Sequence, residues 1–296
     1  MTLGLNNKIL ALMAVACVLS FAAPTPIAPQ KVDGCYQISN ANELYGFAAI
    51  VNGTLSEGRA AESSACGKLT NDIVANDTTD YYCYSKIVSN DTVPACYKYV
   101  VEVDSNGDDH AIPIDVNPEE IEPRTPWTPI KMFSGSFDGQ GHTIWGLENV
   151  DDSTQNNLGF ISTVVRGSAT KPVTVRNLVF REGGIKGRDT VGVVVARNSG
   201  FLLLENLSLF SPVRGRRHVG VFVGRNNGVL SVKNGFAWRA TGERAVGVVV
   251  GSNSGTMDVD GLSNGYGFET EKSNRNQLIS FCHFLNNIFW CRQSIF

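Results

Sequence analysis

The chain has 296 residues, of which 43% are hydrophobic and 18% charged, and its formal net charge is -3. This composition argues against a disordered chain, and the slightly acidic balance argues against a nucleic-acid partner. The 30 glycines are about 10% of the chain, against about 7% in an average protein, and they predict many turns.

The first 22 residues resemble a secretory signal peptide. Lys8 precedes an apolar run over residues 9–23, with the small residues Ser20 and Ala22 at the end of the leader. The run is shorter than the roughly 20 apolar residues needed to span a bilayer. We therefore expect cleavage after Ala22 and a secreted or cell-surface protein with no transmembrane segment. A lipoprotein-type cleavage before Cys17 is the alternative.

A helix is predicted over about residues 40–52, with Ser39 as its N-cap. Its apolar face should cover the N-terminal end of the β-structure that follows, since open strand edges invite aggregation. The residues expected on this face are Leu44, Phe47, Ala48 and Val51.

Cysteines cluster in the N-terminal third of the chain, at positions 35, 66, 83 and 96, with two more at 282 and 291. An even cluster in an exported chain predicts disulfides, and four cysteines allow three connectivities. The mirrored tyrosine-rich surroundings of Cys83 and Cys96 favour the pair Cys83–Cys96, which leaves Cys35 with Cys66. Zinc is the competing use, but it favours closely paired ligands such as C-x-x-C, and the sequence has none.

Residues 76–126 are predicted to be an insertion that carries one disulfide and a hairpin. The hairpin strands, residues 99–103 and 111–116, flank the turn dipeptide Asn106-Gly107. A calcium loop formed by Asp104, Asn106, Asp108 and Asp109 is the alternative for this turn. It is disfavoured because its sixth position is Asp109, where an EF-hand requires glycine.

Three ten-residue segments repeat in the second half of the chain. VGVVVARNSG begins at Val191, VGVFVGRNNG at Val219 and VGVVVGSNSG at Val246. The same step separates the asparagines of a second row, at 177, 206 and 234, and the glycines at 187, 215 and 242. Short β-branched runs between Gly, Asn and Ser indicate strands. The repeat therefore predicts an all-β chain, a single right-handed parallel β-helix over residues 33–271.

The repeat also places Asn198, Asn226 and Asn253 above one another at a turn. Stacked asparagine side chains form hydrogen-bond ladders, so we predict a structural ladder here. A ligand-binding row of asparagines is the alternative.

Several segments resemble secreted bacterial proteins that carry the GLUG motif. They are residues 36–53, residues 68–73, WTPI from Trp127, the stretch FSGSFDGQGHTIWGL from Phe133, and the V-G repeats. The resemblance implies a β-helix at the cell surface and carries no agreed catalytic residues. Residues 76–126 would interrupt the coils as the insertion.

The repeats carry arginines that stacking would align into exposed basic ridges, and Trp145, Trp238 and Tyr266 offer flat faces for sugar rings. Guanidinium groups suit sulfated or carboxylated glycans and other anionic surface polymers. Solvated turns are the structural alternative. The predicted binding ridge comprises Arg188, Arg197, Arg216, Arg217, Arg225, Arg244 and Trp238.

No catalytic, cofactor or metal residues are predicted. Asp138 and His142 lie four apart in FDGQGH, a spacing that also suits acid–base catalysis, but the glycines between them favour a turn. We therefore expect a non-catalytic structural or adhesive module. A polysaccharide lyase or glycosidase is the alternative, because unrelated β-helices carry out both reactions.

Residues 272–296 depart from the repeat pattern. Leu278, Phe281, Cys282, Leu285, Ile288 and Phe289 follow helical spacing. The tail is therefore predicted to be a capping helix, or else a truncated or out-of-frame ending.

The charges are unevenly distributed along the chain before this tail. Residues 33–130 hold 16 acids and 5 bases, net -11, whereas residues 131–271 hold 12 acids and 15 bases, net +3.

Overall fold

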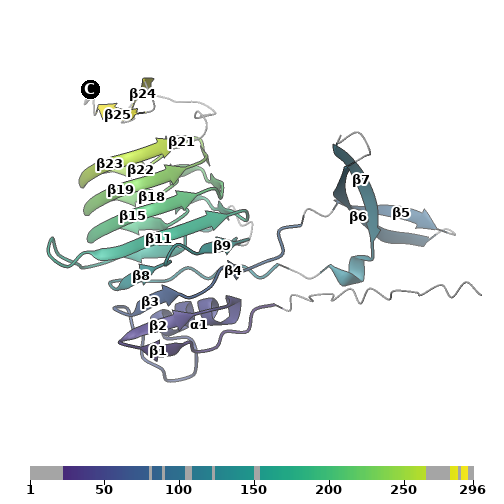
Figure 1. The fold of residues 1–296 in the computed structure, drawn as a ribbon, viewed down its shortest axis with the longest axis horizontal. Coiled ribbons are helices and arrows are strands. Elements are labelled where there is room, and N and C mark those ends of the chain that lie inside the picture. The colour runs from purple at the N-terminus through teal and green to yellow at the C-terminus, as the bar shows by residue number, and fades with distance from the viewer. Residues whose placement is uncertain are drawn as a thin grey trace, which may run out of the picture.

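A computed structural model describes residues 23–79, 82–88, 91–103, 109–121, 124–149, 154–264, 281–285 and 288–292. These residues are nearly all β-structure with one α-helix, and the parallel strands stack into a β-solenoid of about eight turns (Figure 1). The predicted fold class, with its N-terminal helix and disulfide-bearing insertion, is confirmed. The signal peptide over residues 1–22, and Tyr266, lie outside the described residues.

The largest sheet runs along the whole stack and contains ten strands. Its first pair, β1 and β2, is antiparallel, and the strands that follow are parallel. β1 begins before the boundary predicted at residue 33. The strands are β1 (Gln30–Val32), β2 (Cys35–Ile38), β3 (Cys66–Leu69), β8 (Ser136–Asp138), β11 (Val173–Arg181), β15 (Phe201–Leu209), β19 (Val229–Ala237) and β23 (Thr256–Asn264), with β4 (Ile73–Val74) and β9 (Thr143–Trp145) beside this path.

Three smaller parallel sheets form the other sides of the coils. One contains β10 (Ile161–Val164), β14 (Val195–Asn198), β18 (Val223–Asn226) and β22 (Val250–Asn253). A second contains β12 (Ile185–Lys186), β16 (Val213–Arg214) and β20 (Ala240–Thr241), and the third β13 (Asp189–Gly192), β17 (Arg217–Gly220) and β21 (Arg244–Gly247). Val191, Val219 and Val246 are successive register partners, so the sequence repeats align one per coil.

The core is a column of apolar side chains enclosed by these sheets. Phe160 contacts Phe137 with ring centroids 5.0 Å apart and Phe180 at 5.4 Å, and all three rings are fully buried. Burying each such side chain contributes about 1.5–3 kcal/mol. The glycine of the V-G step is required by a close approach: a Cβ on Gly220 would lie 2.1 Å from the Val223 carbonyl oxygen.

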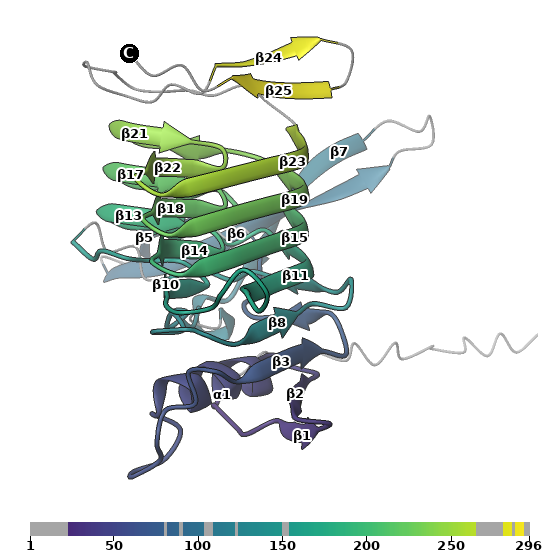
Figure 2. The same cartoon turned by 90° about the vertical axis from the view of Figure 1, so that its left-hand side faces the viewer.

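The predicted helix is present as α1 (Ala41–Asn52), but its N-cap is Asn40 and not Ser39. Asn40 has an extended backbone, and its side-chain oxygen accepts from the Glu43 amide. Ser39 instead donates to the Glu43 carboxylate from its amide and its hydroxyl. Phe47 packs on Phe137, so α1 closes the N-terminal end of the core, at the opposite end of the stack from β23 (Figure 2).

The insertion forms a separate antiparallel sheet that stands away from the stack (Figure 1). It consists of β5 (Tyr82–Val88), β6 (Asp91–Val103) and β7 (Asp109–Val116), followed by the short 3-10 helix η1 (Pro118–Glu120). Tyr99 pairs with Pro113, so the predicted hairpin is confirmed. Its turn, with Asp104, Asn106 and Asp108, lies outside the described residues, whereas Asp109 begins β7.

Both predicted disulfides are present. Cys35–Cys66 joins register partners on the parallel strands β2 and β3, with 4.5 Å between the Cα atoms. Cys83–Cys96 joins register partners on the antiparallel strands β5 and β6. One disulfide therefore belongs to the coil stack and the other to the insertion.

The capping helix predicted in the tail is wrong. Residues in this region form two antiparallel strands, β24 (Phe281–Leu285) and β25 (Ile288–Arg292). Phenylalanine, isoleucine and tryptophan, which occur in these two segments, favour strands. Helical spacing over so short a stretch does not distinguish a helix from a hairpin.

Candidate binding surface

The outward-facing basic residues lie where each coil turns from one short sheet into the next. A single glycine makes this turn, because residues 186–188 read Lys-Gly-Arg and residues 214–216 read Arg-Gly-Arg. β12 pairs in parallel with β16, which places Lys186 beside Arg214. The parallel register thus stacks like charges at about the 4.8 Å strand spacing.

Three arginines surround one carboxylate on the far side of this turn. Arg217 Nη2 lies 2.8 Å from Asp189 Oδ2, and Arg216 Nη2 lies 3.1 Å from the same oxygen. Both arginines also reach Asp189 Oδ1 through Nε, and Arg188 Nε lies 3.8 Å from Oδ2. The carboxylate is mostly covered, whereas the guanidinium groups are about half exposed.

The pKa of Asp189 lies far below its usual range, and hydrogen bonds from Arg217 are the main cause. Burial opposes this shift, and the hydrogen bond and charge of Arg216 reinforce it. Asp189 is therefore ionised throughout the neutral and mildly acidic range. One negative charge balances only one of the three arginines and holds two of them in fixed orientations.

A second arginine row lies on the neighbouring sheet. Arg197 of β14 is the register partner of Arg225 of β18, and Arg225 Nε donates to Asn227 Oδ1 at 3.1 Å. Burial lowers the pKa of His218, and the charges of Arg225 and Arg217 lower it further. Because Arg217 of one row and Arg225 of the other both act on His218, the two rows meet at a common corner of the coils.

The predicted basic ridges thus correspond to two rows of arginines on neighbouring sheets. Arg244 is the register partner of Arg217 and extends the row that contains Asp189. Within the described part of the chain, the Arg244 side chain has no hydrogen bond or ion pair. Trp238 belongs to neither row and directly follows the end of β19. The structure thus brings four of the six arginines, Arg188, Arg216, Arg217 and Arg225, close to Asp189 or His218, and Trp238 is not among the contacts of either.

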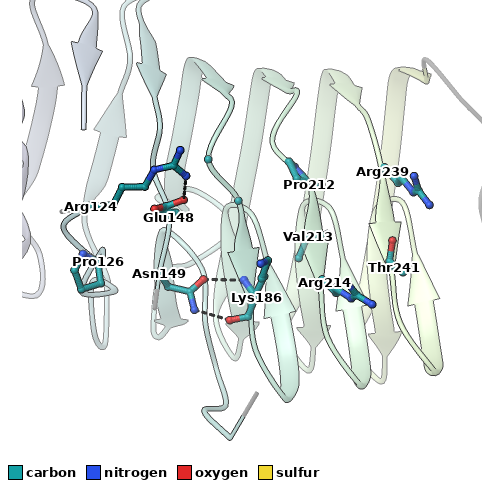
Figure 3. A pocket seen from close by; sticks show the side chains of 12 residues that line it. Arg124, Pro126, Glu148, Asn149, Lys186, Pro212, Val213, Arg214, Arg239 and Thr241 are labelled. Carbon is teal, nitrogen blue, oxygen red and sulfur yellow. Dashed lines mark hydrogen bonds and ion pairs between the residues drawn. The ribbon is translucent and has the colours of Figure 1, made fainter. Parts of the chain in front are cut away.

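A groove beside these rows has a volume of about 770 Å³ (Figure 3). Four cationic residues line it, Arg124, Lys186, Arg214 and Arg239, against one carboxylate, Glu148. None of these four was among the residues predicted from the sequence. The sequence contained a pattern that could have identified Lys186 and Arg214, because these two residues repeat at the same spacing as the ridge arginines. Arg124 had none, since it lies at the end of the insertion, outside the repeats, and reaches the groove only through the fold.

Aromatic residues and one arginine form a row along the ends of the long strands. Arg181 is the register partner of Trp145, and its Cζ lies 5.5 Å from the Trp145 ring centroid and 4.5 Å from that of Phe210. Trp238 donates its amide to the Leu209 carbonyl, so it continues this row one coil further. Trp238 is 42% exposed. In the sequence it directly precedes Arg239, which lines the groove.

The asparagine ladder is confirmed. Asn198 Nδ2 donates to Asn226 Oδ1 at 2.7 Å, and Asn226 Nδ2 donates to Asn253 Oδ1 at 2.8 Å. Each side-chain oxygen also accepts from the glycine amide two residues later, for example Asn226 Oδ1 from the Gly228 amide. Asn198 and Asn226 are completely buried. The ladder is a structural element of the core, and its two buried members are closed to a ligand.

Asp138 and His142 have separate partners. Asp138 accepts from the Gln140 amide, Asn177 Nδ2 and Arg176 Nε, whereas His142 Nδ1 lies 3.1 Å from Asp72 Oδ1. Burial raises the pKa of Asp138, but these three donors outweigh it and hold the pKa below its usual value. The FDGQGH stretch is a turn in which Asp138 anchors the next coil.

Within the described ranges, no group of three or more His, Cys, Asp or Glu residues is placed to hold a metal ion. The same described residues contain no helix that is long and apolar enough to cross a membrane.

Comparison with protein-family models, with curated proteins and with solved structures gives no match. The fold and this surface define a class by themselves: a disulfide-containing parallel β-solenoid with basic residues stacked along one corner.

Proposed function

We propose that this protein is a secreted or cell-surface, non-catalytic module, similar in kind to GLUG-motif proteins, that adheres to anionic glycans or surface polymers. The observation that carries the proposal is the surplus of positive charge at the coil corner, where one carboxylate faces three arginines. Two disulfides support an exported protein, because disulfides persist in oxidising compartments.

The chemistry of the corner fits an extended anionic partner. Guanidinium groups make paired hydrogen bonds to carboxylates and sulfates, and Asp189 already holds Arg216 and Arg217 in place. Each row has arginines in two successive coils, Arg197 with Arg225 and Arg217 with Arg244, so the surface presents positive charge at a repeated spacing along part of the stack. A polymer with a charge on every unit gains from such a repeat through several weak contacts at once.

Retention of the purified chain on sulfated, carboxylated and neutral polysaccharide beads tests this function. The combined variant Arg188→Ala, Arg197→Ala, Arg225→Ala and Arg244→Ala removes four charges but leaves the Asp189 contacts of Arg216 and Arg217. We expect it to elute from the charged beads at clearly lower salt than the wild type. Lys171→Ala, in the exposed turn before β11, is the matched control and should leave retention unchanged.

Two results would contradict the proposal. Equal retention of the four-arginine variant and the wild type would exclude the basic corner as the binding surface. Release of shortened chains from the charged beads by the wild type would favour the alternative, a polysaccharide-cleaving enzyme.

A further inference from the structure

The insertion carries most of the exposed large hydrophobic side chains in the described part of the molecule. Eight of the 13 such residues lie on β5, β6 and β7. Alternate residues of a strand point to one face of a sheet, and directly paired residues share that face. An exposed apolar patch of this kind marks a surface that contacts another molecule. We call one face of this sheet the tyrosine face; it consists of Tyr82 and Tyr84 of β5, Tyr97, Tyr99, Val101 and Val103 of β6, and Asp109 and Asp115 of β7.

The four tyrosines form one continuous aromatic surface. The Tyr97 ring centroid lies 5.4 Å from those of Tyr82 and Tyr99, and 6.3 Å from that of Tyr84. The three outer tyrosines are about half exposed. Because the rings already contact one another, they lose little side-chain freedom when a partner covers them. Tyrosine is also among the residues enriched in protein–protein interfaces.

Carboxylates lie along one edge of this aromatic surface. Asp115 is the register partner of Tyr97, and Asp109 is that of Val103. Both side chains are exposed, and neither has an ion pair within the described ranges. Lys86 is the base on this face, two residues beyond Tyr84 on the opposite edge strand. The whole insertion, residues 76–126, holds 11 acids and 3 bases, net -8. Such a face suits arginine, which stacks on aromatic rings and pairs with carboxylates.

The same chain carries the complementary surface. The two arginine rows hold six guanidinium groups, and the carboxylates next to them in the sequence are Asp189 and Glu243, so the rows keep a net positive charge. Arg197 and Arg244 have no hydrogen bond or ion pair among the described residues. The insertion stands away from the stack, and no contact described within the chain joins the tyrosine face to the rows (Figure 1).

We propose that the tyrosine face of one copy of this chain binds the arginine rows of a second copy. This inference goes beyond the proposed function, because the partner is the protein itself. Two tyrosine faces brought together place like charges opposite each other, whereas a tyrosine face on the rows brings opposite charges together. The contact joins two different surfaces, so exchange of both insertions gives a closed dimer and one-way binding gives a longer chain.

Sedimentation velocity over a range of protein concentrations tests this contact. The wild type should associate at about 0.1 M salt and dissociate at about 1 M salt, where charges are screened within about 3 Å. Tyr99→Ala combined with Asp115→Lys, the face variant, should weaken association by about tenfold or more. Ile87→Ser, on the opposite face of β5, is the matched control and should change it less than about twofold.

A second face variant separates loss of the contact from loss of the fold. Asp109→Lys combined with Asp115→Lys leaves every ring in place and reverses only the exposed charges, so it should weaken association several-fold at the lower salt. Limited proteolysis of both face variants should show an insertion as resistant within residues 76–126 as that of the wild type. Unchanged association of both variants would overturn the proposal.

Mixing two defective variants tests which surfaces meet. The row variant loses its four arginines but keeps its tyrosine face, whereas the face variant keeps its rows. Each alone should be monomeric, and a mixture of the two should form a mixed complex. If the mixture stays monomeric while the wild type associates, the contact joins like surfaces and the proposal is wrong. The row variant combines Arg188→Ala, Arg197→Ala, Arg225→Ala and Arg244→Ala.

The outcomes separate this inference from the proposed function. If the wild type is monomeric at every concentration at the lower salt but is retained on charged beads, the self-association is wrong and the function stands. If it associates as expected but is not retained, the function is wrong and the self-association stands. Retention of the face variant on the beads should equal that of the wild type, because its rows are intact.

Discussion

The coil stack and the insertion sheet contain similar strand-forming residues but bury them to very different extents. In the stack, Phe222, Val221 and Val223 are completely buried. In the insertion, Ile87 is 78% exposed and Val101 66% exposed, and Cys96 is the one buried hydrophobic residue on the strands described there. The stack therefore has a core, whereas the insertion is a single sheet with solvent on both faces.

The sources of stability differ accordingly. Each coil of the stack covers the apolar side chains of the next, and hydrogen-bonded asparagines connect the layers. The insertion depends on strand pairing, one disulfide and contacts between exposed tyrosines, such as Tyr82 with Tyr99 at 5.5 Å. A three-stranded sheet is close to the minimum for independent stability. The same strand propensity thus produces a robust element only where a second layer buries it.

Truncation of a core ring should have the largest effect. Phe222→Ala removes a fully buried side chain, and we expect a loss of about 3–5 kcal/mol in the free energy of unfolding. Tyr99→Ala in the insertion, where half of the side chain is exposed, should cost about 1 kcal/mol or less. Denaturant titrations of both variants measure the difference, and similar losses would contradict the contrast between the two regions.

Loss of the insertion disulfide should have the next largest effect, and a local one. Cys83 and Cys96 are 13 residues apart, and closing a loop of this size contributes about 3 kcal/mol. We expect the double variant Cys83→Ser with Cys96→Ser to be cleaved by protease within residues 76–126 while the stack stays resistant. Cleavage spread equally through the repeats would show that the insertion supports the stack.

The asparagine ladder should contribute less than a core ring. Asn226→Ala leaves the buried Asn198 amide and the Gly228 amide without their side-chain acceptor, which costs about 1–3 kcal/mol. Asn227→Ala is a control at the next position, where the side chain contacts only Arg225 among the described partners. If both variants have the stability of the wild type, the ladder aligns coils without stabilising them.

The smallest effect should be the pH dependence of the Asp189 cluster. The pKa of Asp189 is lower in the folded chain than the usual value of about 3.9, so its stabilisation is present above about pH 4 and is lost as the pH falls below that value. The difference in thermal stability between the wild type and Asp189→Asn should therefore shrink on acidification. Solvent screens these half-exposed arginines, so the effect is modest. If the difference in thermal stability grew on acidification, the conclusion that folding lowers the pKa of Asp189 would be wrong.

The repeat period made much of the core predictable. Val191, Val219 and Val246 recur at nearly constant spacing, and a constant spacing in a solenoid directly gives the register of neighbouring coils. The ladder of Asn198, Asn226 and Asn253 followed from the same spacing. The disulfides were predictable because the tyrosine-rich surroundings of Cys83 and Cys96 favour one pair, which leaves Cys35 with Cys66.

Features without a repeat were less predictable. The helix cap fell on Asn40 because Ser39 and Asn40 are both good caps, and only the backbone geometry distinguishes them. The tail carried apolar residues compatible with both a helix and a hairpin. The repeats indicated both arginine rows, but the sequence does not show where a coil bends between β13 and β14, so the meeting of the two rows at His218 was not predictable.

By itself, the sequence determined the coil length, the register, the ladder and the alignment of basic residues at each turn, since all of these follow from local periodicity. Only the tertiary structure decided that Asp189 neutralises part of the arginine row and that Arg124 joins Lys186, Arg214 and Arg239 in one groove. The physical reason is that charge balance and cavity shape depend on distances between segments far apart in the chain, and these distances are set by packing.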